Sequence, residues 1–457
     1  MRIIHTSDWH LGQNFMGKIR EKEHQKFLDW LLATIDNVKA DVLVVAGDIF
    51  DTGTPPSYAR AMFNQFIVSL RSTRCTRAVF VAGNHDSAAT LNEARELLAC
   101  LDVFVCGRVF ENPRDHVLVL NNANGRPGAL LCAVPFIRPR DLIKSTAGET
   151  GQDKKQALTD TISDFYHQVY EAALEKQKEL ELNKSLPILA TGHLTMVGGM
   201  TSESVRDIYI GSLDAFPGNG FPAFDYVALG HLHRAQQVKG ADHIQYSGSP
   251  IPLSFDEGKK EKQVLLLSFE EKGVMEIKAV QVPCFRKLCT IKGNLDQIEK
   301  QISLLSDHDP DKTMWLEVEV AADDYLFDLH ARIQAMIEEM PIELLRIKRK
   351  RKPGETGIDV EAKEKLEELS VEEVFLRRLA LEEHDDQDRE LLLNMFREIV
   401  YNIDQSDCAD QTDQSDKTGK VDQPDTTHQT DKTDKVDQPD TTNQTDKAEL
   451  TEQGDES

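Results

Sequence analysis

The sequence predicts an α/β layered domain in its N-terminal part, followed by a smaller α+β module, a helical segment and a polar tail. Over residues 1–255, short apolar runs typical of strands alternate with amphipathic runs typical of helices, which is the pattern of α/β folds. At 457 residues the chain exceeds the size at which one hydrophobic core usually stops growing. We therefore expect more than one module.

Short apolar runs mark the strands of the first domain. They lie at residues 1–8, 41–48, 77–84, 129–136, 187–193 and 225–231. Two amphipathic stretches between them predict helices, because their apolar side chains are spaced to share one face. These side chains, which we expect in the core, are Phe27, Leu31 and Ile35 in the first stretch and Met62, Phe63, Phe66, Ile67 and Leu70 in the second.

The remaining chain divides by its pattern into three further segments. Residues 256–282 are strand-like and complete the first domain, which we place at 1–282, with a boundary near Pro283. Residues 283–355 predict a β-α-β-α-β module with strands at 289–293, 314–320 and 342–350 and helices at 294–305 and 323–339. Residues 356–403 predict one or two amphipathic helices that need a surface to pack on. A polar tandem repeat, 416–430 and 431–445, predicts that residues 404–457 are disordered.

Composition excludes several classes of protein. The seven cysteines are scattered without C-x-x-C spacing, which argues against a disulfide framework and a thiolate zinc site and favours a reducing cytoplasm. The chain has no signal peptide pattern and no long apolar run, so neither export nor membrane insertion is expected. The formal charge of −25 includes −11 in residues 404–457. Since the body is also acidic, binding of DNA requires a local basic surface, metals or a partner.

Side chains that can bind metals follow five of the predicted strands. Carboxyl ends of strands share one edge of an open sheet, so these residues could converge on one crevice. Taken singly, each is more often a structural or turn residue, but five in order are hard to assign to chance. A glycine, Gly47, Gly83, Gly192 or Gly230, directly precedes four of the groups and permits close backbone approach. The residues are Asp8, His10, Asp48, Asp51, Asn84, His85, Asp86, His193, His231 and His233.

These ordered motifs resemble those of the calcineurin-like metallophosphoesterases. Among them the chain is most similar to the SbcD family, the nuclease subunits of bacterial SbcCD complexes, over residues 1–400. The resemblance implies a two-layered β-sandwich flanked by helices, with a smaller α+β capping domain and C-terminal helices. Stretches that carry it include TSDWHLGQNF (6–15), VAGDIFDTGTPPSYAR (45–60), AGNHDSAATLNE (82–93), ALGHLHRAQ (228–236), YSGSPIPLSFDE (246–257) and LSVEEVFLRRLALEE (369–383).

The resemblance also implies a role for each site residue. It places Asp8, His10 and His233 on one metal ion, Asn84, His193 and His231 on a second, and Asp48 between both. His85 is implied to be catalytic, orienting the phosphate or protonating the leaving oxygen, and Asp86 to hold the tautomer of His85. Some relatives have a histidine where Asp51 stands, so for Asp51 we favour a supporting or capping carboxylate.

The ligand types agree with this assignment. Nitrogen and oxygen donors without cysteine suit two divalent ions, Mn²⁺ best and Fe or Mg²⁺ less well. The expected reaction is attack of a metal-activated hydroxide on a phosphodiester, without a covalent enzyme intermediate. The family implies 3′–5′ exonuclease action on double strands and endonuclease action on single strands and hairpins, in DNA repair, replication and recombination.

Partners are also implied by the resemblance. It predicts that residues 356–403 dock on an SbcC-type ATPase, that the chain is a homodimer within a heterotetramer, and that it is cytoplasmic and nucleoid-associated. A basic run ends the α+β module, and two interpretations of it stay open, a contact to the DNA backbone and a solvated surface. The run comprises Arg346, Lys348, Arg349, Lys350, Arg351 and Lys352.

Two alternative functions use the same residues. One is a phosphomonoesterase or small-molecule phosphodiesterase, which would need neither the second module nor the helices of residues 356–403. The other is a scaffold whose metals only stabilise the fold, against which the presence of His85 beside a complete ligand set argues.

Overall fold

We describe the fold from a computed structural model, in which residues 1–138, 141, 151–182, 185–205, 215–269, 275–305, 313–321 and 329–349 are described. The chain divides into two compact units, Met1–Pro353 and Gly354–Ser457, and all of these residues lie in the first. The predicted helices of residues 356–403 and the tail of residues 404–457 lie outside the described residues. The predicted boundary at Pro283 stays a prediction.

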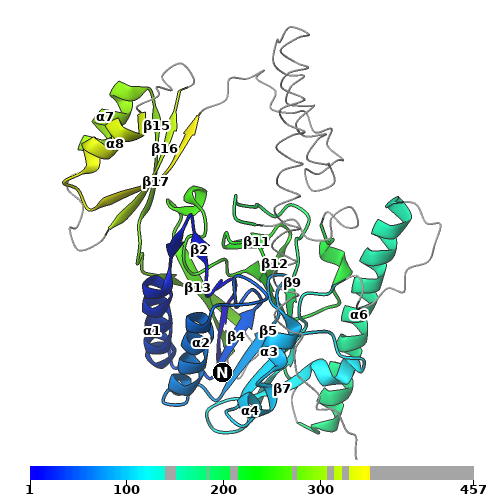
Figure 1. Ribbon diagram of the computed structural model, residues 1–457. Coiled ribbons are helices and arrows are strands. Elements are labelled where there is room, and N and C mark those ends of the chain that lie inside the picture. Colours follow the sequence, from blue (N-terminus) through cyan, green and yellow to red (C-terminus); the bar gives the residue numbers. More distant parts are fainter. Residues whose placement is uncertain are drawn as a thin grey trace, which may run out of the picture. The chain divides into compact units, whose positions relative to one another are not determined.

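Two six-stranded sheets form the N-terminal body (Figure 1). In the first, β1, β4, β5 and β6 run parallel, while β13 pairs antiparallel with β1 and β14 with β13. The strand order is β14 (Met275–Val282), β13 (Lys262–Phe269), β1 (Arg2–Thr6), β4 (Val42–Ala46), β5 (Arg77–Val81) and β6 (Val103–Cys106).

The second sheet also has a parallel centre, but antiparallel strands lie at both of its edges. Strands β12, β10, β9 and β8 are parallel, and β11 and β7 pair antiparallel at the two ends. The order is β11 (Gln236–Val238), β12 (Ala241–Tyr246), β10 (Tyr226–Gly230), β9 (Ile188–His193), β8 (Pro127–Cys132) and β7 (Val117–Asn121). All six strands predicted for residues 1–231 are confirmed, each within a few residues.

The two sheets pack face to face. Val42 and Val44 of the first sheet share a buried apolar cluster with Leu189 and Ala228 of the second. Because these strands are apolar on both faces, they must be covered on both sides, which the sandwich achieves on the inner faces and helices achieve outside. The predicted two-layered sandwich flanked by helices is confirmed.

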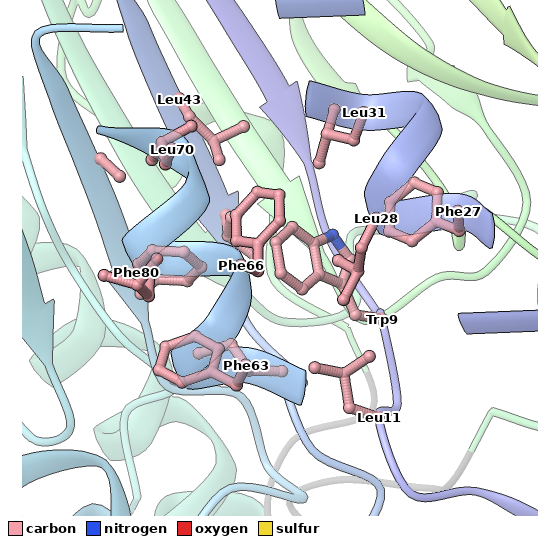
Figure 2. Close-up of a cluster of buried hydrophobic side chains, with 14 of the residues drawn as sticks. Trp9, Leu11, Phe27, Leu28, Leu31, Leu43, Phe63, Phe66, Leu70 and Phe80 are labelled. Carbon is pink, nitrogen blue, oxygen red and sulfur yellow. The ribbon is translucent and has the colours of Figure 1, made fainter. Parts of the chain in front are cut away.

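Helices cover the outer face of each sheet. Helices α1 (Glu21–Val38) and α2 (Ser57–Leu70) bury the two predicted apolar stripes against the first sheet, around Trp9 (Figure 2). The Trp9 ring meets Phe66 edge-on with centroids 5.3 Å apart, and it meets Phe80 at 5.7 Å. Trp9 lies between the candidate ligands Asp8 and His10, so this core fixes the backbone that carries both. Helix α6 (Gly151–Glu179) covers the second sheet.

The remaining elements of the body are short. They are β2 (Asn14–Phe15), β3 (Lys18–Ile19), α3 (Ala88–Asn92), α4 (Arg95–Ala99) and the 3₁₀ turns η1 (Pro113–His116), η2 (Gly218–Gly220) and η3 (Phe255–Glu257). None of the helices in the described part of the chain combines the length and apolar character needed to cross a membrane. The six cysteines in this part are free thiols.

The α+β module has the predicted β-α-β-α-β order. Its parallel sheet runs β15 (Leu288–Gly293), β16 (Met314–Val320) and β17 (Ile342–Arg349), with α7 (Leu295–Ser303) and α8 (Leu329–Ile337) in the crossovers. The module contacts the body through a buried cluster in which Trp315 stacks on Phe15, with centroids 5.4 Å apart.

Candidate metal centre

The predicted site residues lie where the carboxyl ends of five strands meet. Asp8 and His10 follow β1, Asp48 follows β4, and Asn84, His85 and Asp86 follow β5 of the first sheet, while His193 ends β9 and His231 and His233 follow β10 of the second. The residues converge, as the strand-end pattern predicted, and the site lies between two sheets rather than at the edge of one.

Asp8, His10 and His233 form one cluster. A ligand atom of each lies within 4.8 Å of those of the other two, and all three side chains are buried. The His10 and His233 rings meet edge-on with centroids 5.1 Å apart. This is the set that the sequence assigned to one metal ion.

Asn84, His193 and His231 form a second cluster. The Asn84 Oδ1 atom lies 2.9 Å from His193 Nε2 and 3.1 Å from His231 Nδ1. One carboxylate reaches both clusters, since Asp48 Oδ2 lies 3.6 Å from His10 Nε2 and 3.2 Å from His193 Nε2. Its other oxygen accepts a hydrogen bond from the backbone N–H of His85 at 2.9 Å.

The histidines of these clusters are oriented to present a lone pair. The Nδ1 atom of His193 donates to the carbonyl oxygen of Ala46 at 2.9 Å, which leaves Nε2 toward Asn84 and Asp48. The Nε2 atom of His10 is buried and has no hydrogen-bond partner among the described residues. A buried polar atom without a partner is costly unless a ligand satisfies it, so this donor set fits divalent ions.

Two comparisons with known proteins bear on this geometry. The family model described as "Calcineurin-like phosphoesterase" matches residues 1–235, and one described as "Type 5 capsule protein repressor C-terminal domain" matches residues 284–383. The SbcD subunit of the nuclease SbcCD from Escherichia coli (strain K12) is 48% identical over 403 residues, covering 88% of this chain and 98% of the relative. The chain belongs to the SbcD family of calcineurin-like phosphoesterases. The corresponding SbcD protein from Rhodobacter capsulatus is 31% identical, over 75% of this chain and 86% of the relative.

Membership of the SbcD family makes the chain an enzyme of the phosphoesterase class that uses divalent metals. The ionisation of the cluster agrees with that use. Burial opposes the charged form of Asp48, but the histidines around it outweigh this effect and hold its pKa well below the usual range. Burial likewise opposes protonation of His193, yet Asp48 beside it raises its pKa to about 9. In the metal-free centre the proton on His193 balances the charge of Asp48, and a bound cation would displace that proton.

Backbone strain is concentrated at this SbcD-family centre. Asp8, His10, Asp48 and His231 have φ angles of 53°, 48°, 50° and 97°, in the left-handed region that side chains other than glycine rarely adopt. Strain of this kind persists where the surrounding structure enforces it, and it accumulates at functional sites. Gly47 adopts φ +95°, and a Cβ atom there would lie 2.1 Å from His193 Nδ1. The predicted close backbone approach is confirmed at Gly47.

The predicted task of Asp86 is wrong. Its carboxylate accepts hydrogen bonds from the backbone N–H groups of Gly83, Ile49 and Phe50, at 2.9 to 3.1 Å. The side chain of Asp86 therefore turns back toward the strands. Its hydrogen bonds connect the segment that follows β4 to the segment that follows β5. The Nδ1 atom of His85 instead donates to the carbonyl oxygen of Asp51, at 2.7 Å.

Asp51 contributes its side chain as well as its carbonyl. Its Oδ1 atom lies 3.0 Å from Nδ1 of His10, which is the contact expected of a supporting carboxylate. A ligand atom of Asp51 also lies within 4.8 Å of those of His10 and His85. Asp51 thus orients two of the predicted site residues.

The basic run of the second module is partly engaged in ion pairs. Arg346 and Lys348 contact Glu203, at 3.3 and 3.2 Å, and both also contact Glu317. Residues 350–352 and the Arg349 side chain lie outside the described residues. The choice between a DNA contact and a solvated surface stays open.

Sequence reasoning missed a set of polar residues around His233. Ser204, Glu257 and Lys262 contact one another or His233, and Glu257 is fully buried. The available signal was the stretch at residues 246–257, which contains Glu257 and which resembles the SbcD family beyond the metal-binding motifs.

Proposed function

We propose that this chain is a Mn²⁺-dependent DNA nuclease, with 3′–5′ exonuclease action on double strands and endonuclease action on single strands and hairpins. It acts with an SbcC-type ATPase in DNA repair, replication and recombination, as a homodimer within a heterotetramer in the bacterial cytoplasm. The observation that carries the proposal is the convergence of two ligand clusters on Asp48, together with relatives named as SbcCD nuclease subunits.

Asp8, His10 and His233 would hold one ion, Asn84, His193 and His231 the other, with Asp48 shared. Two divalent ions, when bound, would lower the pKa of water towards about 7 and offset the charge of the phosphodiester. The two carboxylates Asp8 and Asp48 leave such a site positive overall, which favours an anionic substrate.

His85 is the residue we assign to the substrate. It is half-buried beside His10, with ring centroids 4.7 Å apart, whereas the ligand histidines are buried. Its Nδ1–H donates to the Asp51 carbonyl, so a protonated His85 directs its Nε2–H to the phosphate or the leaving oxygen. Asp86 fixes the backbone on either side of Asp48 and takes no part in proton transfer.

The test is cleavage of a labelled hairpin DNA with Mn²⁺, Mg²⁺ or a chelator, with and without an SbcC-type ATPase and ATP. We expect Mn²⁺-dependent cleavage that the ATPase strengthens. In a His85→Ala variant cleavage falls by about 10²–10⁴-fold while bound metal is retained. The matched control is His167→Ala, since His167 is an exposed histidine on α6.

The outcomes separate the proposal from its alternatives. Hydrolysis of a small phosphoester without cleavage of DNA would leave the metal chemistry intact and remove the DNA assignment. Tight metal binding without any hydrolysis would favour a scaffold. Full cleavage by His85→Ala would refute the role of His85.

A further inference from the structure

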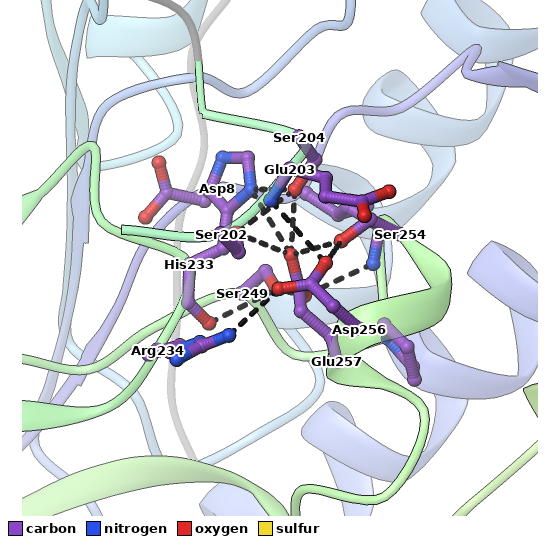
Figure 3. Close-up of polar contacts among 12 residues, drawn as sticks. Asp8, Ser202, Glu203, Ser204, His233, Arg234, Ser249, Ser254, Asp256 and Glu257 are labelled. Atoms are coloured by element: carbon purple, nitrogen blue, oxygen red, sulfur yellow. Dashed lines mark hydrogen bonds and ion pairs between the residues drawn. The ribbon is translucent and has the colours of Figure 1, made fainter. Parts of the chain in front are cut away.

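A buried polar network surrounds the Nδ1 side of the His233 ring (Figure 3). The Ser204 hydroxyl lies 2.6 Å from His233 Nδ1 and donates to Glu257 Oε1 at 2.5 Å. The Glu257 oxygen itself lies 3.5 Å from the same ring nitrogen. The network therefore acts on one candidate metal ligand, and its shortest contact to the His233 ring is the Ser204 hydroxyl.

Glu257 is the acceptor at the centre of this network. Its Oε1 atom accepts hydrogen bonds from the hydroxyls of Ser202, Ser204 and Ser254, at 2.7, 2.5 and 3.0 Å. Its Oε2 atom accepts from the backbone N–H of Leu253 at 3.1 Å. A carboxylate can only accept, so the Ser204 hydroxyl donates to Glu257, whereas the Ser254 hydroxyl also lies 2.5 Å from Asp256 Oδ1.

Lys262 fixes Glu257 and the His233 backbone together. Its ammonium group donates to Glu257 Oε2 at 2.6 Å, to the carbonyl oxygen of His233 at 3.0 Å and to the Ser249 hydroxyl at 2.7 Å. All three ammonium protons are therefore used, and a fully buried carboxylate gains its counter-charge. The network holds the main chain of His233 as well as its ring.

The hydrogen bonds determine which ring nitrogen carries the proton. A serine hydroxyl has one proton, and Ser204 gives it to Glu257, so Ser204 can only accept from His233. His233 Nδ1 must therefore carry a hydrogen. In the neutral ring Nε2 then carries the lone pair. Nε2 can therefore bind a metal ion while the hydrogen bond of Nδ1–H holds the ring in position.

Ser204 lies in a segment that is anchored on both sides. Ser202 and Ser204 turn inward to Glu257, while Glu203 between them contacts Arg346 and Lys348 of β17 at 3.3 and 3.2 Å. Residues 202–205 form a turn, in which the N–H of Val205 donates to the Ser202 carbonyl oxygen at 3.2 Å. The position of Ser204 is therefore set by contacts on both faces of its segment.

We propose that Ser204 and Glu257 are positioning residues that hold His233 in the Nδ1–H tautomer, with Nε2 directed to the metal. The inference rests on the proposed function, because it takes His233 as a metal ligand. Removal of such a supporting contact typically weakens metal affinity by about 10–100-fold. The loss is expected at the site of Asp8, His10 and His233 and not at the other site.

The experiment is titration of the full chain with Mn²⁺, with bound metal measured directly, for the natural protein and three variants. Ser204→Ala removes the hydroxyl, Ser204→Thr keeps it, and Glu257→Gln removes the charge. The matched control is Glu261→Gln, because Glu261 is an exposed glutamate that contacts Gln281. Thermal unfolding in chelator checks that each variant is folded, and the absorption bands of bound Co²⁺ report the geometry of the weakened site.

We expect the natural protein to bind two ions. In Ser204→Ala one of the two should bind about 10–100-fold more weakly, with altered Co²⁺ bands. Ser204→Thr should recover the affinity of the natural protein. Equal affinity of Ser204→Ala and the natural protein would overturn the inference and leave the proposed function standing. If the natural protein binds no metal, the proposed function fails and the inference with it. If Glu257→Gln does not fold because Lys262 is left unpaired, the two Ser204 variants decide the question.

Discussion

The carboxyl ends of β10 and β4 approach each other closely at the metal centre, so Gly230→Ala should strongly destabilise the protein. A Cβ atom at Gly230 would lie 1.9 Å from the carbonyl oxygen of Ala46 and 2.8 Å from His193 Nδ1. Carbon and oxygen need about 3.3 Å, so the exits of β10 and β4 would have to separate by more than about 1 Å. The neighbour is a backbone carbonyl that cannot rotate away, which places the cost at the upper end of overpacking, about 2–3 kcal/mol.

The assay for Gly230→Ala is thermal unfolding in chelator, followed by Mn²⁺ binding. At about 2–4 °C per kcal/mol, the melting temperature should fall by roughly 4–12 °C. Metal binding should weaken too, because the displaced Ala46 carbonyl is the group that orients His193. The control is Gly218→Ala, since a Cβ atom at Gly218 meets nothing within 4 Å. If both variants melted within about 2 °C of each other, the close approach would not matter and the reasoning would be refuted.

Three further predictions follow from other parts of the structure. Burial lowers the pKa of His5 to about 3, so the folded protein requires the neutral form of this ring. The full contribution of His5 to the free energy of unfolding should be present above about pH 6.5, and the free energy should fall by up to ~1.4 kcal/mol per pH unit below that. The measurement is urea unfolding in chelator from pH 4.5 to 8. In His5→Phe the slope of the unfolding free energy against pH should decrease by the equivalent of about one proton, and an unchanged slope would contradict the assignment. Asp51→Asn should weaken Mn²⁺ binding by about 10–100-fold, measured by equilibrium dialysis, because it supports His10. Trp315→Ala should destabilise the second module by about 3–5 kcal/mol, and unchanged resistance to protease would contradict its anchoring role.

Local patterns predicted the strands that carry the site. Apolar runs ending in Asp8, Asp48 or His193 encode both a buried strand and a polar residue at its carboxyl end, so residue order alone predicted that these residues converge, although not that two sheets contribute them. The apolar faces of the two helices were also predicted, because a helix with one buried face has apolar residues at regular helical spacing in its sequence.

Contacts between distant segments could not be predicted in this way. His233 and Ser204 are 29 positions apart, and Ser204 and Glu257 are 53 apart, so no periodicity links them. The role that the resemblance implied for Asp86 is wrong because the turn of the chain directs its carboxylate to backbone N–H groups and away from His85. The stacking of Trp315 on Phe15 depends on how two modules pack, which neither sequence segment encodes alone.

The measurement that tests the central claim most directly is a titration with Mn²⁺ in which bound ions and hairpin cleavage are followed in the same samples. The account predicts that cleavage rises with the second ion and is lost in Asp48→Asn, because one oxygen of Asp48 lies 3.6 Å from His10 Nε2 and 3.2 Å from His193 Nε2 and so reaches both ligand clusters. Full cleavage with a single ion bound, or undiminished cleavage by Asp48→Asn, would contradict a two-metal nuclease.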